Sequence, residues 1–368
     1  MKPRVLFVSR RVELPLTESE RRRWDAIRTQ LDFRVVASGA VADDDEFVLA
    51  REPPVLAGAA YYASLPVRVA HELRRFRPHA VVAQGGHETA AALTGRRIAR
   101  VDTAVIADVH GDYRSPTRLY GSRLRSLLNP LADRVAVAGV RHADGVRTVT
   151  SYTTDLVRSI GVEPTAEFPA YMDFATFLES PPAPLPDSPR ALFVGVLERY
   201  KNVDGLAAAW RQAGPRVPEA RVRLIGDGAL SGLVAQLVAD LPAQTSWSRG
   251  LSQPEIAAEL DGSTCLVLPS RSEGMGRVIV EAFCRGRAVV ASRVGGIPDL
   301  VDDEVNGLLV DPADVAALEN ALVRVLSDTA LAERLGAGAR HSADRWIVSA
   351  DEFARRLRDL VEQVAGLS

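Results

Sequence analysis

The chain has 368 residues, of which 47% are hydrophobic and 25% charged, and its formal net charge is −2 at pH 7. This length is sufficient for two domains with separate cores, and the composition is typical of soluble globular proteins. The small net charge gives no reason to expect nucleic acid as a partner. Residues 1–185 carry 25 basic and 22 acidic side chains, a balance of +3, and residues 186–368 carry 20 and 25, a balance of −5. The positive balance of the first half could favour an anionic acceptor or a membrane surface there. Ordinary solvated surface can show the same difference in charge.

The first residues, MKPRVLFVSRR, contain an apolar run of only five residues before Arg10. Such a run is shorter than the apolar region of a secretory signal and far shorter than a membrane span. We therefore expect a cytoplasmic protein, with at most peripheral contact at the inner membrane face. Cys265 and Cys284 lie in apolar runs, which predicts buried free thiols in a reducing compartment.

The first half alternates short apolar runs with helical patterns. The expected strands are Val5–Ser9, Phe33–Ser38, Ala80–Ala83, Ala104–Asp108 and Val146–Thr150, and the expected helices are Ser19–Leu31, Leu65–Phe76 and Arg123–His142. This alternation predicts right-handed βαβ units and a parallel sheet that is covered on both faces.

Residues 181–189, PPAPLPDSP, are rich in proline, which is incompatible with a helix interior or a central strand. We therefore predict a surface connector there. The alternation then restarts. The expected strands are Ala191–Gly195, Val222–Ile225, Cys265–Leu268, Ala288–Ser292 and Gly307–Val310, and the expected helices are Val203–Gln212, Leu230–Ala239, Gln253–Leu260, Gly276–Cys284, Val315–Leu326 and Ser349–Val364. We predict two doubly wound Rossmann-like α/β domains, with the ligand in a cleft that the two domains face.

The most informative stretch is residues 265–292, CLVLPSRSEGMGRVIVEAFCRGRAVVAS. A strand ends at Pro269, and a loop with Gly274 and Gly276 leads into a helix whose free N–H groups suit a phosphate. In this helix Glu281 is surrounded by apolar residues, where a carboxylate is costly unless a partner satisfies it. The partner could be a pair of ribose hydroxyls, or it could be Arg277 or Arg285 at helical spacing.

Glu273 and Glu281 lie eight apart in a PS-x2-EG-x-G-x4-EA frame, which resembles the E-x7-E motif of glycosyltransferase family 4. The resemblance continues in residues 288–314, in Leu192–Gly195 with Lys201-Asn202, and in Leu224–Gly228, so that it covers most of 191–327. The family implies a GT-B fold, transfer of a hexose-type sugar from a nucleotide-diphosphate donor to an acceptor hydroxyl with retention, and no metal or other cofactor.

The resemblance also implies roles for individual residues. Glu281 would bind the ribose, Glu273 would bind hydroxyls of the transferred sugar, and the backbone from Gly274 through Met275 and Gly276 to Arg277 would hold sugar and phosphate oxygens. Lys201 falls at the lysine that neutralises the leaving diphosphate, and it is the only lysine besides Lys2.

One position departs from the family pattern. The family usually has an arginine directly after Gly195, where this chain has Val196. Arg199 could reach the same phosphates, or it could simply be solvated. In the first half, residues 107–114, ADVHGDYR, are similar to the family's His-Gly-Asp segment, so His110 is the expected histidine beside the donor sugar.

The family pattern also gives expected domains: an acceptor-side domain over 1–172, a donor domain over 173–348, and a closing helix within 349–368 that crosses back to the first domain. Residues 84–87, Gln-Gly-Gly-His, could line the cleft or form a plain loop, and the turn at 10–15 lacks the glycine that many relatives have. Base contacts are expected near residues 249–252.

The sequence also bears on three other functions. A nicotinamide-dependent oxidoreductase is disfavoured because Ser231 breaks the G-x-G-x-x-G spacing after Gly226 and Gly228. A metal-dependent transferase could use the Asp43–Asp45 run, which otherwise reads as a solvated loop. A non-catalytic partner that keeps the fold and binds a sugar nucleotide is the main alternative. The sequence does not identify the base, the sugar or the acceptor, for which a lipid-linked sugar, a glycan and a small natural product are all candidates.

Overall fold

The computed structural model describes residues 2–40, 45–51, 57–113 and 129–367. The chain forms two compact units, one made of residues 1–171 and 348–368 and the other of residues 172–347. We call them unit 1 and unit 2 and describe each by itself. No helix within the described ranges combines the length and the apolar character needed to cross a membrane.

Unit 1 is built around a parallel sheet of seven strands in the order β3-β2-β1-β4-β5-β6-β7. The strands are β1 (Arg4–Arg11), β2 (Asp32–Ser38), β3 (Phe47–Ala50), β4 (Ala80–Gln84), β5 (Ala104–Val109), β6 (Gly145–Thr148) and β7 (Ala166–Glu167). The helices are α1 (Glu18–Gln30), α2 (Ala57–Phe76), α3 (Gly86–Ala99), α6 (Asn129–Arg141), α7 (Ser151–Arg158) and α16 (Ala350–Ala365).

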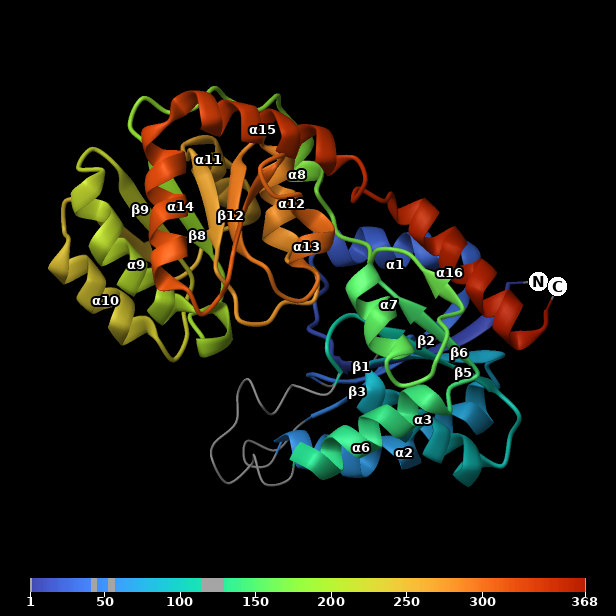
Figure 1. Ribbon diagram of the computed structural model, residues 1–368. Coiled ribbons are helices and arrows are strands. Elements are labelled where there is room, and N and C mark those ends of the chain that lie inside the picture. Colours follow the sequence, from blue (N-terminus) through green and yellow to red (C-terminus); the bar gives the residue numbers. More distant parts are fainter. Residues whose placement is uncertain (1, 41–44, 52–56, 114–128, 368) are drawn as a thin grey trace. The chain divides into compact units, whose positions relative to one another are not determined.

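Alternate residues of β1 face the two sides of this sheet. Val5 and Phe7 pack with the buried residues of α1 and α16, whereas Leu6 and Val8 pack with those of α2 and α3. Figure 1 shows α1 beside α16 on one face, and α2, α3 and α6 on the other. A capping box, in which Thr17 and Glu20 bond reciprocally, starts α1 and so fixes where this helix begins.

Unit 2 contains a parallel sheet of six strands in the order β10-β9-β8-β11-β12-β13. The strands are β8 (Arg190–Val194), β9 (Arg221–Ile225), β10 (Thr245–Ser248), β11 (Cys265–Leu268), β12 (Ala288–Ser292) and β13 (Gly307–Val310). The helices are α8 (Ala175–Leu178), the 3-10 turn η1 (Arg199–Lys201), α9 (Val203–Arg216), α10 (Ser231–Asp240), α11 (Gln253–Asp261), α12 (Arg277–Cys284), α13 (Ile297–Leu300), α14 (Val315–Ser327) and α15 (Thr329–Ala343).

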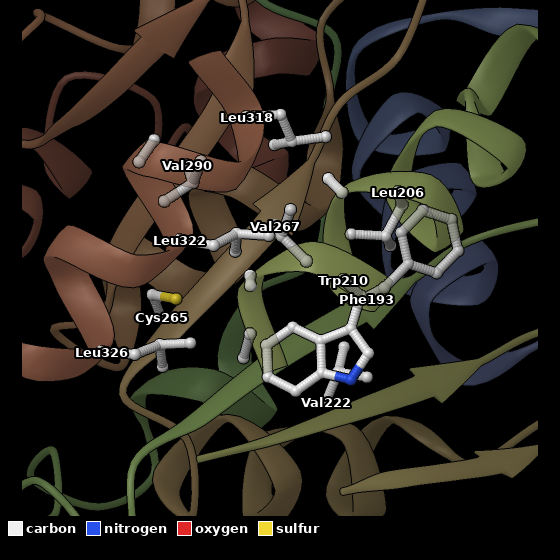
Figure 2. Close-up of a cluster of buried hydrophobic side chains, with 14 of the residues drawn as sticks. Phe193, Leu206, Trp210, Val222, Cys265, Val267, Val290, Leu318, Leu322 and Leu326 are labelled. Atoms are coloured by element: carbon white, nitrogen blue, oxygen red, sulfur yellow. The ribbon is translucent and has the colours of Figure 1, made fainter. Parts of the chain in front are cut away.

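The core of unit 2 lies on both faces of its sheet. Figure 2 shows one face, where Trp210 of α9 and Leu322 of α14 pack with strand side chains such as Phe193 and Val267. The other face carries α11 and α12. Cys265 and Cys284 are buried free thiols, as the apolar runs predicted.

The proline-rich segment 181–189 has neither helix nor strand and lies within unit 2. Two buried arginines hold its backbone: Arg285 donates to the carbonyls of Ser180 and Pro181, and Arg287 donates to that of Ala183. The segment is therefore fixed to unit 2 by hydrogen bonds from side chains.

In both sheets the strand order reverses beside the first strand of the unit. The chain moves from β1 outward to β2 and β3 and then returns to β4, and it moves from β8 outward to β9 and β10 and then returns to β11. In open parallel sheets such a reversal leaves a crevice at the carboxyl ends of the strands, where ligands bind. Two places are therefore prepared for a site: the ends of β1 and β4, and the ends of β8 and β11.

Candidate functional site

The loop between β11 and α12 brings Glu273 to the carboxyl end of the unit 2 sheet. Gly276 takes a left-handed conformation, with φ of +71°, and so lets the loop turn into α12. The backbone of Glu273 lies directly on Gly295, where an added Cβ would come within 1.9 Å of the Glu273 carbonyl oxygen. Gly296 donates its N–H to the same oxygen at 3.2 Å. Only glycine fits at 295, and this close approach fixes the position of Glu273.

Lys201 and Glu273 form an ion pair between the loops that follow β8 and β11. Ser270 also donates its hydroxyl to the Glu273 carboxylate, at 3.3 Å. The two charged side chains are only 13% and 15% exposed, so little water screens the pair. The structure thus joins two of the residues that the sequence analysis selected.

Arg271 holds the two loops together. Its backbone N–H donates to the carbonyl of Tyr200 at 2.7 Å, and its guanidinium donates to the carbonyl of Arg199 at 2.8 Å. The same guanidinium binds both carboxylate oxygens of Asp204, each at 2.8 Å. The hydrogen bonds from Arg271 are the largest cause that lowers the pKa of Asp204. This contact was not predicted, and the arginine two residues before Glu273 is its only signal in the sequence.

Glu281 is buried in α12, with a side chain only 9% exposed. Burial raises the pKa of this carboxyl, and the neighbouring charge of Arg277 opposes the shift. Nε of Arg277 donates to Oε1 of Glu281 at 2.7 Å, and another guanidinium nitrogen donates to the carbonyl of Asp173 at 3.1 Å. Arg285 pairs with Asp261 instead. The partner of Glu281 is therefore Arg277 and not Arg285.

The remaining donor-side residues surround this pair of glutamates. Met275 is buried, and Gly274 is half-buried in the loop. Arg199 has an exposed side chain and makes no ion pair within the described ranges. Val196, where the family arginine was expected, is 46% exposed. Gly226 lets the ends of β8 and β9 approach closely, because a Cβ there would lie 1.8 Å from the carbonyl oxygen of Gly195.

In unit 1, His110 follows β5 and belongs to a polar cluster around the buried Arg147. Its Nε2 lies 2.9 Å from Oδ2 of Asp108, and Arg147 donates to Oδ1 of the same carboxylate at 2.7 Å. Burial alone would raise the pKa of Asp108, but the charges and hydrogen bonds of Arg147 and His110 outweigh it and hold this pKa well below the usual range.

Arg147 is fully buried and has further contacts. It donates to the carbonyls of Phe168 and Pro169 at 3.0 and 2.9 Å, and it stacks on the rings of Phe168 and Phe353 at 4.1 and 5.3 Å from their centroids. Arg147 therefore contacts both residues 168–169, just before unit 2 begins, and helix α16. Arg147 was not predicted as a site residue, because its neighbours in the sequence do not indicate that it is paired.

Of the other expected residues of unit 1, Gln84 lies beside Asp108 in the sheet register, and part of the Asp43–Asp45 run lies outside the described ranges. Gln84 is exposed and accepts a hydrogen bond from Ser9 at 3.0 Å. Asp43 and Asp44 lie outside the described residues, and Asp45 is exposed. Within the described part of the chain, no three His, Cys, Asp or Glu side chains are grouped so as to hold a metal ion.

Part of unit 2 is similar in sequence to known proteins. The family model "Glycosyl transferases group 1" matches residues 178–342, which include all of the donor-side residues named above. A D-inositol 3-phosphate glycosyltransferase from a Nocardioides species is 34% identical over 191 residues, which cover 47% of this chain and 41% of that protein. The chain spans less than half the length of each curated relative compared.

Solved structures extend the similarity to both units. Sucrose-phosphate synthase from Thermosynechococcus elongatus matches with a TM-score of 0.76 and 20% identity over 100% of both chains. HepE from Anabaena, in complex with UDP and glucose, matches with a TM-score of 0.71 and 17% identity over 97% of this chain and 99% of that one. The predicted fold is confirmed: the chain has two parallel-sheet Rossmann-like domains of the GT-B type, and it is similar to glycosyltransferases in sequence and in structure.

Proposed function

We propose that this protein is a glycosyltransferase that moves a hexose-type sugar from a nucleotide-diphosphate donor to an acceptor hydroxyl, with retention and without a metal. The observation that carries the proposal is the Lys201–Glu273 pair at the ends of β8 and β11. A nucleotide-diphosphate sugar presents an anionic diphosphate directly beside neutral sugar hydroxyls. An ammonium suits the first group, and a carboxylate that accepts hydrogen bonds suits the second.

Lys201 would stabilise the diphosphate as it leaves the sugar. One well-placed donor to a developing negative charge contributes about 3–4 kcal/mol to lowering a barrier. Glu273 would accept hydrogen bonds from sugar hydroxyls, and the amides of residues 274–277 would bind phosphate or sugar oxygens at the start of α12. The exposed side chain of Arg199 is available to the same phosphates.

Glu281 would bind the ribose of the nucleotide. Its Oε1 accepts from Arg277, and no hydrogen bond to its Oε2 is present within the described ranges. A carboxylate that is buried, oriented by one guanidinium and left with a spare acceptor oxygen matches a ribose diol, which donates two hydroxyls. In unit 1, His110, oriented by Asp108, would hold hydroxyls of the sugar or the acceptor.

The comparisons support the class of reaction. The family match covers the loops that carry Lys201, Glu273 and Glu281. HepE, which shares the fold, was captured with UDP and glucose, the class of ligand proposed here.

The first test identifies the donor. The purified chain is screened for thermal stabilisation by UDP, GDP, ADP and TDP and by their sugars, because a ligand stabilises the native state in proportion to its affinity and concentration. With that donor, Lys201→Met is expected to depress kcat by roughly 10²–10³-fold. The matched control is Lys2→Met, because Lys2 is the only other lysine and is exposed.

Glu281→Gln is expected to weaken nucleotide binding by roughly 10–100-fold, the value of a hydrogen bond to a charged group. Transfer should persist in EDTA, and the product should keep the anomeric configuration of the donor. If Lys201→Met and Glu281→Gln both retain wild-type kinetics, the assignment of the site is wrong.

The second candidate is a non-catalytic subunit that keeps the fold and binds a sugar nucleotide. The exposed Val196, at the position where the family pattern has an arginine, favours it. Donor hydrolysis or transfer by the purified chain alone excludes this candidate, whereas nucleotide binding without any turnover supports it.

A further inference from the structure

Unit 1 contains a cavity of about 230 Å³ on the α1 and α16 side of its sheet, next to the ends of β1, β4 and β5. One ordered water needs only roughly 10–15 Å³, so the cavity has room for a small molecule. Its inner wall is apolar and aromatic, with Phe7, Trp24 and Tyr171, and its polar lining includes Arg23 and His110. Mixed walls of this kind are typical of small-molecule sites.

Arg23 brings to this cavity a positive charge that has no ion-pair partner among the described residues. The guanidinium stacks on the Trp24 ring at 4.7 Å from the centroid. Its Nε is buried and has no hydrogen-bond partner, and no carboxylate within the described ranges forms an ion pair with it. Burial lowers the pKa of Arg23, with Glu20 and Asp108 opposing the shift, but a guanidinium stays charged at neutral pH.

The two carboxylates that line the cavity are engaged elsewhere. Glu20 Oε2 accepts from the backbone N–H and the hydroxyl of Thr17 at 2.9 and 2.7 Å, in the capping box of α1. The two oxygens of Asp108 contact Arg147 and His110. Arg23 is therefore the cation of this wall that lacks a direct anionic partner, and a partly buried cation without a partner favours an anionic ligand.

We infer that the cavity is the acceptor subsite and that it takes a small acceptor carrying a phosphate or carboxylate group, which Arg23 binds. The identification as acceptor rests on the proposed function, because His110, which lines the same cavity, is the residue placed beside the sugar hydroxyls. The planar guanidinium would bind two oxygens of the anion, and the aromatic wall would cover the apolar face of a sugar or polyol ring.

The test uses three ligands that share one scaffold: glucose 6-phosphate, glucuronate and glucose. Affinity is measured by calorimetry for the wild-type chain and for Arg23→Gln, Arg23→Lys and Arg21→Gln. Arg21 is the matched control, because it is an exposed arginine of the same helix and its loss changes the net charge equally. Inorganic phosphate tests for an isolated ion site, and vesicles of phosphatidylglycerol or phosphatidylcholine test for a lipid headgroup.

We expect an anionic ligand to bind the wild type at least about tenfold more tightly than glucose, as a hydrogen bond to a charged group requires. Arg23→Gln should abolish this preference, Arg23→Lys should retain part of it, and Arg21→Gln should stay within about twofold of the wild type. The same preference should appear when the ligands serve as acceptors.

Three results overturn the inference: glucose binding as tightly as its anionic analogues, a preference that survives in Arg23→Gln, or binding of inorganic phosphate alone. If the wild type binds phosphatidylglycerol vesicles in preference to phosphatidylcholine vesicles, and Arg23→Gln loses this preference, the anion belongs to a lipid headgroup. Nucleotide binding is measured in the same variants and should not change. If the wild-type chain binds anions through Arg23 but binds no nucleotide, the proposed function fails while the anion site stands.

Discussion

Replacing Arg147 with methionine tests whether the buried cluster of unit 1 depends on this cation. The side chain is fully buried, pairs with Asp108 at 2.7 Å and donates to two backbone carbonyls at 3.0 and 2.9 Å. Methionine retains much of the apolar stem but leaves the Asp108 carboxylate with His110 as its remaining partner and two carbonyls without their donor. Removing one partner of a buried pair costs about 3–5 kcal/mol.

The loss should depend on pH in a defined direction. In the wild type the pKa of Asp108 is lower in the folded than in the unfolded state, where it is about 3.9. The Asp108–Arg147 pair therefore contributes its full stability above the unfolded pKa. This contribution is lost only as pH falls through the folded pKa. Without Arg147, only His110 opposes the effect of burial, so the pKa of Asp108 should rise, and protonation then relieves the penalty. The gap in stability between the wild type and the variant should therefore narrow as pH falls from about 7 towards about 4.

This difference in stability can be measured for unit 1 alone by hydrogen exchange, with mass spectrometry on peptides of β5 and β6. A single melting temperature would not separate the two units. Exchange in Arg147→Met should be roughly 10²–10⁴-fold faster than in the wild type at neutral pH. Arg158→Met is the control: its pair with Glu163 is exposed, at 51% and 78%, and should contribute no more than about 1 kcal/mol. Equal exchange in the two variants, or a gap that does not change with pH, would refute the reasoning.

Three other predictions concern unit 2. Arg271→Ala should change global stability by less than about 1 kcal/mol, because its pair with Asp204 is half exposed, yet it should speed exchange in 199–201 and lower donor affinity; calorimetry with the identified nucleotide checks this. Burial raises the pKa of Cys265 to about 12 and of Cys284 to about 11, so a thiol reagent near neutral pH should label neither in the native protein and both in urea. Glu281→Gln should melt no lower than the wild type without ligand, because a raised carboxyl pKa means that the charged form destabilises the native state at neutral pH; a lower melting temperature would contradict this.

The architecture was largely predictable because buried parallel strands are continuous apolar runs. All ten strands expected from the sequence are present, for example β5 at Ala104–Val109 and β12 at Ala288–Ser292. The strands that were missed, β3, β7 and β10, are three of the four edge strands in the two described sheets; the fourth, β13, was predicted at Gly307–Val310. A short, half-covered edge strand such as Thr245–Ser248 has neither the length nor the hydrophobicity that marks a central strand.

Helices were missed for a different reason. The expected helix at 65–76 is the second part of α2, which begins at Ala57 and continues through Pro66. Proline is most frequent in the first turn of a helix, so Pro66 in the sequence favours a helix that starts near it rather than one that continues through it. The interior helix α3 opens with Gly86 and is rich in alanine, and it lacks the apolar stripe that predicts an amphipathic helix. The expected helix at 123–142 is observed as α6 from Asn129, and its first part lies outside the described residues.

Whether a residue of the candidate site could be predicted depends on how far apart in the sequence its contacts lie. Glu273 and Glu281 belong to one loop and one helix, so a local pattern of glycines and carboxylates could mark them. Arg271 with Asp204, and Arg147 with Asp108, are contacts across 67 and 39 positions of the chain. Nothing in the sequence near Arg147 distinguishes an arginine that is paired inside the core from one that is solvated, and only the fold brings its partner close.

In the unit 2 site each of the two glutamates is paired with a cation. Lys201 is paired with Glu273, and Arg277 is paired with Glu281. Two unit charges about 4 Å apart interact by about 4 kcal/mol at an effective dielectric constant of about 20, so a diphosphate that takes Lys201 must offset the loss of that pair. A nucleoside diphosphate alone would leave the Glu273 carboxylate without its partner and close to negative phosphates. A complete donor brings sugar hydroxyls that give Glu273 new donors, and for this reason we expect the site to hold the donor more tightly than the nucleotide released after transfer.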